Sequence, residues 1–111
     1  VRVTLNRRLT LEAPTRAPDG AGGFTLTWEP LGTLWAAVAP GAPKLQDQPG
    51  AAEARQPLRI TVRGAPVGAP SRPVPGQRFR EGSRLYAITA VTEADADARF
   101  LLCLAREESA L

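Results

Sequence analysis

Histidine and methionine are absent from the 111-residue sequence, and cysteine occurs once, at Cys103. These counts exclude zinc sites built from histidine and cysteine, acid–base catalysis by histidine, Cys–His nucleophile pairs and a disulfide within the chain. Without histidine, no side chain of ordinary pKa changes charge between about pH 5 and 8. We therefore expect no catalytic residue, no cofactor and no metal site.

Long apolar runs are also absent. The longest, residues 34–39 and 100–105, have six residues each, whereas a helix that spans a membrane needs about 20. Residues 1–10 are polar and alternating, unlike an export signal. We expect no membrane partner, and the single cysteine is consistent with a reducing compartment.

The charge is basic, with 14 basic and 11 acidic residues, a net charge of +3 and a pI near 10.0. All the basic residues except Lys44 are arginine, which suits planar contacts with carboxylates and phosphates. The abundance of arginine, alanine, glycine and proline is equally typical of a GC-rich genome. The charge therefore leaves a nucleic-acid partner and a plain solvated surface both open.

Short alternating segments dominate the pattern. Ten glycines and eleven prolines predict many turns and argue against a helical bundle. Between them, apolar and polar residues alternate with the period of strands that have one buried face. The expected strands cover residues 8–12, 24–29, 33–39, 58–63, 77–80, 84–92 and 99–106. Residues 1–111 are predicted to form one all-β domain, a small antiparallel β-barrel or sandwich of six to seven strands with a long central loop.

The strand patterns also predict which side chains share a face. Phe24, Leu26 and Trp28 are expected on one face of a hairpin strand that follows a loop at residues 14–23. Residues 33–39 are apolar on both faces, so we expect a neighbour, such as another subunit, to cover the outer one. In the strand at 84–92, Tyr86 and Ile88 are expected to share their face with Ala90 rather than with Val91.

Two segments show no periodicity. The longer segment is residues 40–57, which has 18 residues. A compact domain rarely contains a structureless loop of that length unless the loop has a function, so we expect one here. Residues 64–76 contain four prolines, which limit hydrogen-bonded ladders.

Few residues are candidates for chemistry. Asp95 and Asp97 are closely spaced carboxylates, but they match no calcium loop and are interpreted as a solvated hairpin tip. Cys103 lies in an apolar segment and is expected to be a small buried hydrophobe. Arg59 and Arg63 share the outer face of one strand, where they would contact either DNA phosphates or another subunit, or remain solvated. An enzyme that uses Asp95 or Asp97 is the least favoured hypothesis.

The order of these segments resembles the head-tail joining family of tailed phages, also called head-closure or stopper proteins, which has counterparts in phage-derived gene transfer agents. The segments that carry the resemblance are 5–11, 19–28, 34–38, a long loop, 59–63, 84–91 and 101–104 with trailing acidic residues. The resemblance implies a small β-barrel that is made in the bacterial cytoplasm and forms a ring of six or twelve copies in the neck of a virion or phage-like particle. Its implied partners are a portal-adaptor protein on the head side, a tail terminator protein on the tail side and the packaged DNA.

The resemblance also implies a channel gate. In such proteins a long loop projects into the channel, and residues 40–57 occupy the matching place. Its polar candidates are Lys44, Gln46, Asp47, Gln48, Glu53 and Arg55. The proline-rich segment 64–76 departs from the commoner family pattern. The alternative function is that of a small basic nucleic-acid-binding β-barrel that uses Arg59 and Arg63.

Overall fold

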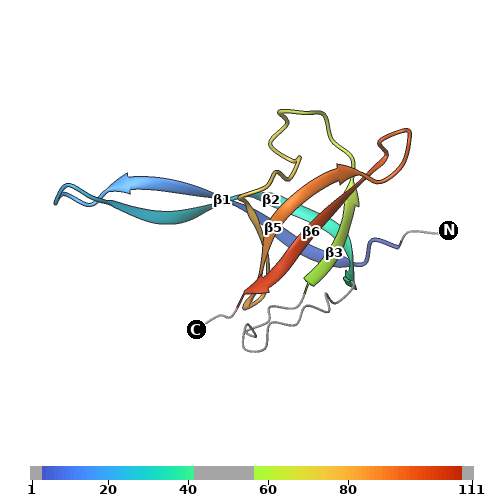
Figure 1. The fold of residues 1–111 in the computed structure, drawn as a ribbon, viewed down its shortest axis with the longest axis horizontal. Coiled ribbons are helices and arrows are strands. Elements are labelled where there is room, and N and C mark those ends of the chain that lie inside the picture. Colours follow the sequence, from blue (N-terminus) through green and yellow to red (C-terminus); the bar gives the residue numbers. More distant parts are fainter. Residues whose placement is uncertain (1–3, 42–56, 109–111) are drawn as a thin grey trace, which may run out of the picture.

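The fold is a closed six-stranded barrel, seen in a computed structural model that describes residues 4–41 and 57–108 (Figure 1). All neighbouring strands are antiparallel, in the order β1-β2-β3-β6-β5-β4. The strands are β1 (Arg7–Pro18), β2 (Phe24–Pro40), β3 (Pro57–Arg63), β4 (Arg78–Glu81), β5 (Arg84–Glu93) and β6 (Phe100–Glu108). The all-β prediction is confirmed, and of the two expected architectures the barrel is the one observed. No helix capable of spanning a bilayer occurs in the described ranges.

Alternation along each strand builds the core. In β3, Leu58, Ile60 and Val62 are buried while Arg59 and Arg63 are exposed, as predicted. The other strands contribute the remaining buried apolar side chains, namely Leu9, Leu11, Ala36, Phe79, Tyr86, Ile88, Leu101, Cys103 and Ala105. Because every strand has two neighbours, the barrel has no open sheet edge around this core.

A bulge in β5 corrects one predicted face. The register with β6 shifts between Ile88 and Ala90, so that Val91 lies opposite the buried Cys103 and packs against the core. Ala90 instead lies opposite the exposed Leu104. The expectation that Ala90 shares a face with Ile88 was wrong, because the extra residue reverses the alternation.

The first two strands are longer than the sequence predicted. The loop expected at 14–23 is confined to residues 19–23, because β1 continues through Pro14 to Pro18. Strand β2 likewise runs without a break through Pro30 and Gly32. The prolines were taken as strand breakers, but proline is tolerated on strands with a free edge.

These extensions form a two-stranded arm that projects from the barrel (Figure 1). The register shifts once, where Leu11 pairs with Gly32 and Glu12 with Pro30, which leaves Leu31 as the bulged residue. Gly32 has a φ of 147° there, a value that side-chain-bearing residues rarely adopt. Beyond the bulge, residues 13–18 pair only with residues 24–29, and we call residues 13–29 the arm.

The segment at 64–77 packs on the barrel without forming a strand, as its prolines predicted. The Gly64 N–H donates to the Arg99 carbonyl at 2.7 Å, and the Arg72 guanidinium donates to the Ala65 carbonyl at 2.9 Å. Pro73 is fully buried. The segment is therefore part of the folded body.

Candidate interaction surfaces

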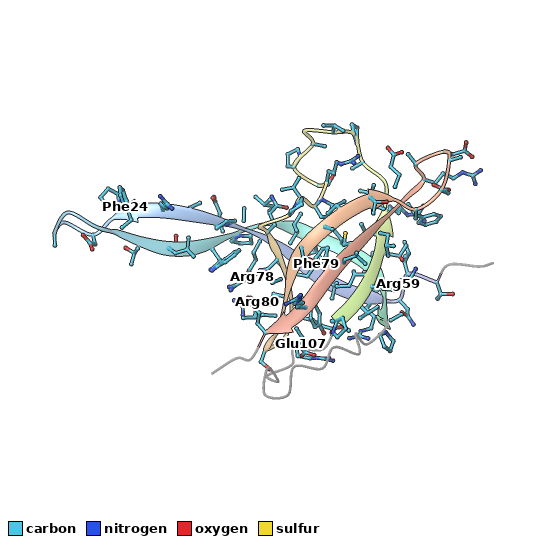
Figure 2. The ribbon with its side chains drawn as sticks, in the orientation of Figure 1. Phe24, Arg59, Arg78, Phe79, Arg80 and Glu107 are labelled. Carbon is cyan, nitrogen blue, oxygen red and sulfur yellow. The ribbon has the colours of Figure 1, made fainter. Side chains whose placement is uncertain are left out.

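A buried carboxylate joins the arm to the barrel. Glu12, 6% exposed, accepts hydrogen bonds from Arg78 Nε at 2.7 Å and from Arg80 Nε at 2.8 Å. The Arg78 guanidinium also lies over the Trp28 ring of the arm, 4.1 Å from its centroid. Figure 2 shows both arginines where the arm meets the barrel. These contacts fix the arm's root to β4.

The charge of Glu12 is stabilised despite its burial. Burial alone raises the pKa of this carboxyl, but hydrogen bonds from Arg80 and Arg78 and their positive charges outweigh it, and the pKa falls below its ordinary value. Sequence reasoning missed this cluster. The available signal was the alternation Arg78–Phe79–Arg80, which places two arginines on the face opposite a core phenylalanine.

A second ionic cluster lies at the end of the barrel that holds the β4–β5 turn. Glu81 accepts two hydrogen bonds from Arg7, at 2.7 and 2.5 Å, and one from the Tyr86 hydroxyl at 2.8 Å. Next to it, Arg84 donates to Glu107 at 2.7 and 2.9 Å and lies over the Tyr86 ring. The pKa of Glu81 is lowered to about 2, mainly by the hydrogen bonds from Arg7. The pKa of Tyr86 is raised to about 12, mainly by burial.

This cluster predicts acid sensitivity. Because the pKa of Glu81 falls from an ordinary 4.5 to about 2 on folding, its stabilisation is complete above pH 4.5 and is lost as the pH falls towards 2. After a discount for partial exposure, we expect a contribution of roughly 1–2 kcal/mol. Urea unfolding of the wild type and of Glu81→Gln should therefore differ most near neutral pH and converge in acid. Equal differences at every pH would contradict this assignment.

The ends of the expected gate segment lie side by side. The Gly41 N–H donates to the Pro57 carbonyl at 2.8 Å, and Pro40 pairs with Leu58. The candidate gate residues Lys44, Gln46, Asp47, Gln48, Glu53 and Arg55 lie outside the described residues. The connection at 42–56 thus begins and ends on two adjacent strands.

Arg59 and Arg63 lie on the outer face of β3, as expected, and both are exposed (Figure 2 labels Arg59). In the described ranges neither has an ion-pair partner. Register places Arg59 between Ala39 of β2 and Leu104 of β6. The two arginines therefore border an apolar region of the same outer surface.

We call this region and its rim the outer patch. Its exposed large apolar side chains are Trp35, at 53%, and Leu104, at 38%. Arg8 lies over the Trp35 ring, 5.8 Å from its centroid. The outer patch comprises Trp35, Ala37, Ala39, Thr61, Leu102 and Leu104, together with Arg8, Arg59, Arg63 and Arg106. Tryptophan and arginine are enriched in protein interfaces, so this composition is typical of a protein contact.

The arm presents a second apolar surface. Phe24 and Leu26 share a face with Trp28, as predicted, but they are 64% and 56% exposed, whereas Trp28 is half-buried under Arg78. The opposite face carries Thr15 and Thr27, whose hydroxyls are hydrogen-bonded at 2.7 Å. The sequence correctly predicted the amphipathic strand but not that its apolar face lies outside the core.

Residues singled out for chemistry serve local structure instead. The Asp95 carboxylate accepts the Arg99 N–H at 2.8 Å, and Asp97 forms an exposed ion pair with the Arg99 guanidinium at 3.1 Å, so both belong to the β5–β6 turn. Cys103 is fully buried, and burial raises the pKa of its thiol to about 12. Within the part of the chain that the structure describes, no three His, Cys, Asp or Glu side chains gather as metal ligands.

Comparison with known proteins identifies the chain's relatives. The family model "Phage head completion protein" matches residues 2–108. A chain of the structure "Virion of native gene transfer agent (GTA) particle" is 45% identical, with a TM-score of 0.79, covering 99% of this chain and 100% of that one. A protein of Shigella flexneri 2a, with a structure determined in solution, is 26% identical, with a TM-score of 0.67, covering 95% of this chain and 94% of that one. No curated protein matches. The chain therefore belongs to the phage head completion protein family, a family of structural phage proteins.

Proposed function

We propose that this chain is a head-closure, or stopper, subunit in the neck of a phage or phage-like particle. In this role it forms a cyclic ring of six or twelve copies that closes the DNA exit channel and docks the tail. A portal-adaptor protein lies on its head side and a tail terminator protein on its tail side. It acts structurally, without catalysis.

The observation that carries the proposal is the match over 100% of a chain from a gene transfer agent particle at 45% identity. Relatives as similar as this share the arrangement of their strands and surfaces, and the match extends from end to end. The outer patch and the arm are two separate apolar surfaces on one small barrel. A ring subunit needs two different contact surfaces, because each copy binds one neighbour on each side.

Imaging of particles tests the role directly. In particles that carry a tagged copy of this chain, we expect the tag in a ring between the head vertex and the tail. Heads made without the protein should lack tails and lose their DNA. A tag in the capsid shell or in the tail tube would contradict the proposal.

The gate role of the segment between β2 and β3 is part of the same proposal. Deletion of residues 46–54 leaves six of the fifteen residues 42–56. Because Gly41 and Pro57 are already hydrogen-bonded, a shorter connection can still join the strands, and the change in stability should be about 1 kcal/mol or less. We expect normal unfolding but particles that leak DNA, measured by nuclease sensitivity of the packaged DNA.

Two outcomes would contradict the gate role. Loss of cooperative unfolding would mean that the segment belongs to the core. Particles that retain DNA as well as the wild type would place the closure elsewhere.

A second candidate is nucleic-acid binding by the outer patch, supported by Arg59 and Arg63, which are exposed and have no ion-pair partner among the described residues. It predicts an affinity for DNA that falls steeply with salt and is reduced by R59E together with R63E. The apolar centre of the patch favours protein as its partner, because phosphate contacts do not need Trp35 or Leu104. Weak DNA binding that is insensitive to both substitutions would remove this candidate.

A further inference from the structure

The arm's apolar face needs a partner that the described chain does not supply. A two-stranded ribbon alone is at best marginally stable in water, and this one is held to the barrel only at its root, through Glu12, Arg78 and Trp28. Its outer part exposes Phe24 and Leu26 and points away from the barrel (Figures 1 and 2). The arm therefore cannot cover its own apolar face by folding on this barrel.

We propose that the arm of one copy lies across the outer patch of the next copy in the ring. This inference rests on the proposed ring function. Phe24 and Leu26 would contact the apolar centre formed around Trp35 and Leu104. The contact joins two different surfaces of the same chain, so it repeats from copy to copy and closes when the rotation between copies divides a full turn.

The arm is suited to dock through its face rather than by strand addition. Pro14 and Pro18 have no N–H, so the edge of β1 cannot offer a continuous hydrogen-bond ladder to another strand. The face that contains Phe24 and Leu26 has no such restriction. On the β1 side of the arm, side-chain packing against a sheet surface is therefore favoured over strand addition.

The dimensions fit a neighbouring copy. Six residues in each strand beyond the bulge give the arm a reach of about 20 Å. The shortest extent of the molecule is 24 Å. An arm of this length spans most of the shortest dimension of one adjacent copy and does not reach a second.

The charge at the tip of the arm is complementary to that of the outer patch. Asp19 lies in the turn of the arm and Glu29 on the same face as Thr27, whereas the arm's one arginine, Arg16, pairs with Leu26 and lies over the Phe24 ring. Backbone N–H groups of Ala21 and Gly23 donate to Asp19 and keep its pKa low, so its carboxylate is ionised. The residues that define the outer patch include four arginines and no carboxylate, so they attract the Asp19 carboxylate at the tip of the arm.

The contact is small, which determines where it forms. One face of the arm covers roughly 10 by 20 Å, so each junction buries about 400 Å² in total, against about 1,200 Å² or more in a stable interface. A junction of this size does not hold free copies together. It forms where the particle places copies side by side and raises their effective concentration.

Thiol cross-linking within particles tests the contact. The variant Leu26→Cys with Leu104→Cys puts one thiol on the arm and one on the outer patch, and both positions are exposed, so folding should be preserved. The native Cys103 is buried and does not react. With a short bis-maleimide, we expect a ladder of covalent oligomers that extends beyond dimers, and no ladder from either single variant.

Each other result has a defined meaning. Dimers from Leu26→Cys alone would show an arm-to-arm contact, and a cross-link to a protein of another mass would show a different partner; either overturns the inference. If the double variant enters particles but does not cross-link, the arm contact is also overturned, whereas the proposed ring function is not. Absence of the wild-type chain from particles would overturn both proposals.

A pair of surface variants gives an independent readout. Phe24→Ser with Leu26→Ser removes the apolar face, whereas Thr25→Ser with Thr27→Ser alters the opposite face and serves as the matched control. Both should unfold like the wild type, because all four side chains are exposed. We expect about tenfold fewer copies per particle for the first variant and no change for the second. Equal incorporation of the two would contradict the docking of the apolar face.

Discussion

Replacement of Glu12 by alanine is expected to lower the free energy of unfolding by about 3 kcal/mol, because it leaves the Arg78 guanidinium buried without its carboxylate. The side chains of Glu12 and Arg78 are only 8% and 11% exposed, whereas Arg80 can regain water at 42% exposure. The loss should appear in urea unfolding at neutral pH. Because Arg78 also lies over Trp28, the fluorescence of the arm's tryptophan should change as well.

An exposed ion pair supplies the control for this prediction. Asp97→Ala breaks the ion pair with Arg99. The side chains of Arg99 and Asp97 are 70% and 67% exposed, and such a pair contributes less than about 1 kcal/mol to stability. If Glu12→Ala destabilised the protein no more than Asp97→Ala, the buried cluster would not be what holds the arm's root.

Replacement of Gly64 by alanine should lower the stability by about 2–3 kcal/mol, through overpacking rather than a lost contact. An added Cβ would lie 2.1 Å from the Ala98 carbonyl oxygen, and the Gly64 N–H is fixed by its hydrogen bond to Arg99. Because the atoms in contact belong to the backbone, the β5–β6 turn must move. In a domain of this size the melting temperature should fall by at least about 8 °C.

Gly41 is the matched control for Gly64. A Cβ at Gly41 would approach Pro57 no closer than 3.3 Å, so Gly41→Ala should cost less than about 1 kcal/mol. Similar losses for the two variants would mean that loss of glycine itself, rather than the close approach to Ala98, explains the effect.

The all-β fold and the core of β3 could be predicted because they depend on local alternation. Leu58, Ile60 and Val62 face inward for the same reason that the pattern suggested, since successive side chains on a strand point to opposite faces. The exposure of Arg59 and Arg63 follows from the same rule. The buried state of Cys103 was also predictable, because it lies in an apolar strand.

The arm and its anchoring cluster could not be predicted from the same rules. Phe24, Leu26 and Trp28 have the pattern of a strand with a buried face, but nothing local distinguishes a face that packs on the core from one that projects into solvent. Glu12 lies 66 residues from Arg78 and 68 from Arg80, so only closure of the barrel between β1 and β4 brings their charges together.

The sequence by itself determined that this chain is all-β and that it lacks the residues of most enzyme active sites, because composition and alternation act locally. The tertiary structure decided that the strands close into a barrel, that a bulge turns Val91 inward and that an apolar arm projects beyond the core. These features depend on register and on contacts between distant strands, where a shift of one residue reverses which side chains are buried.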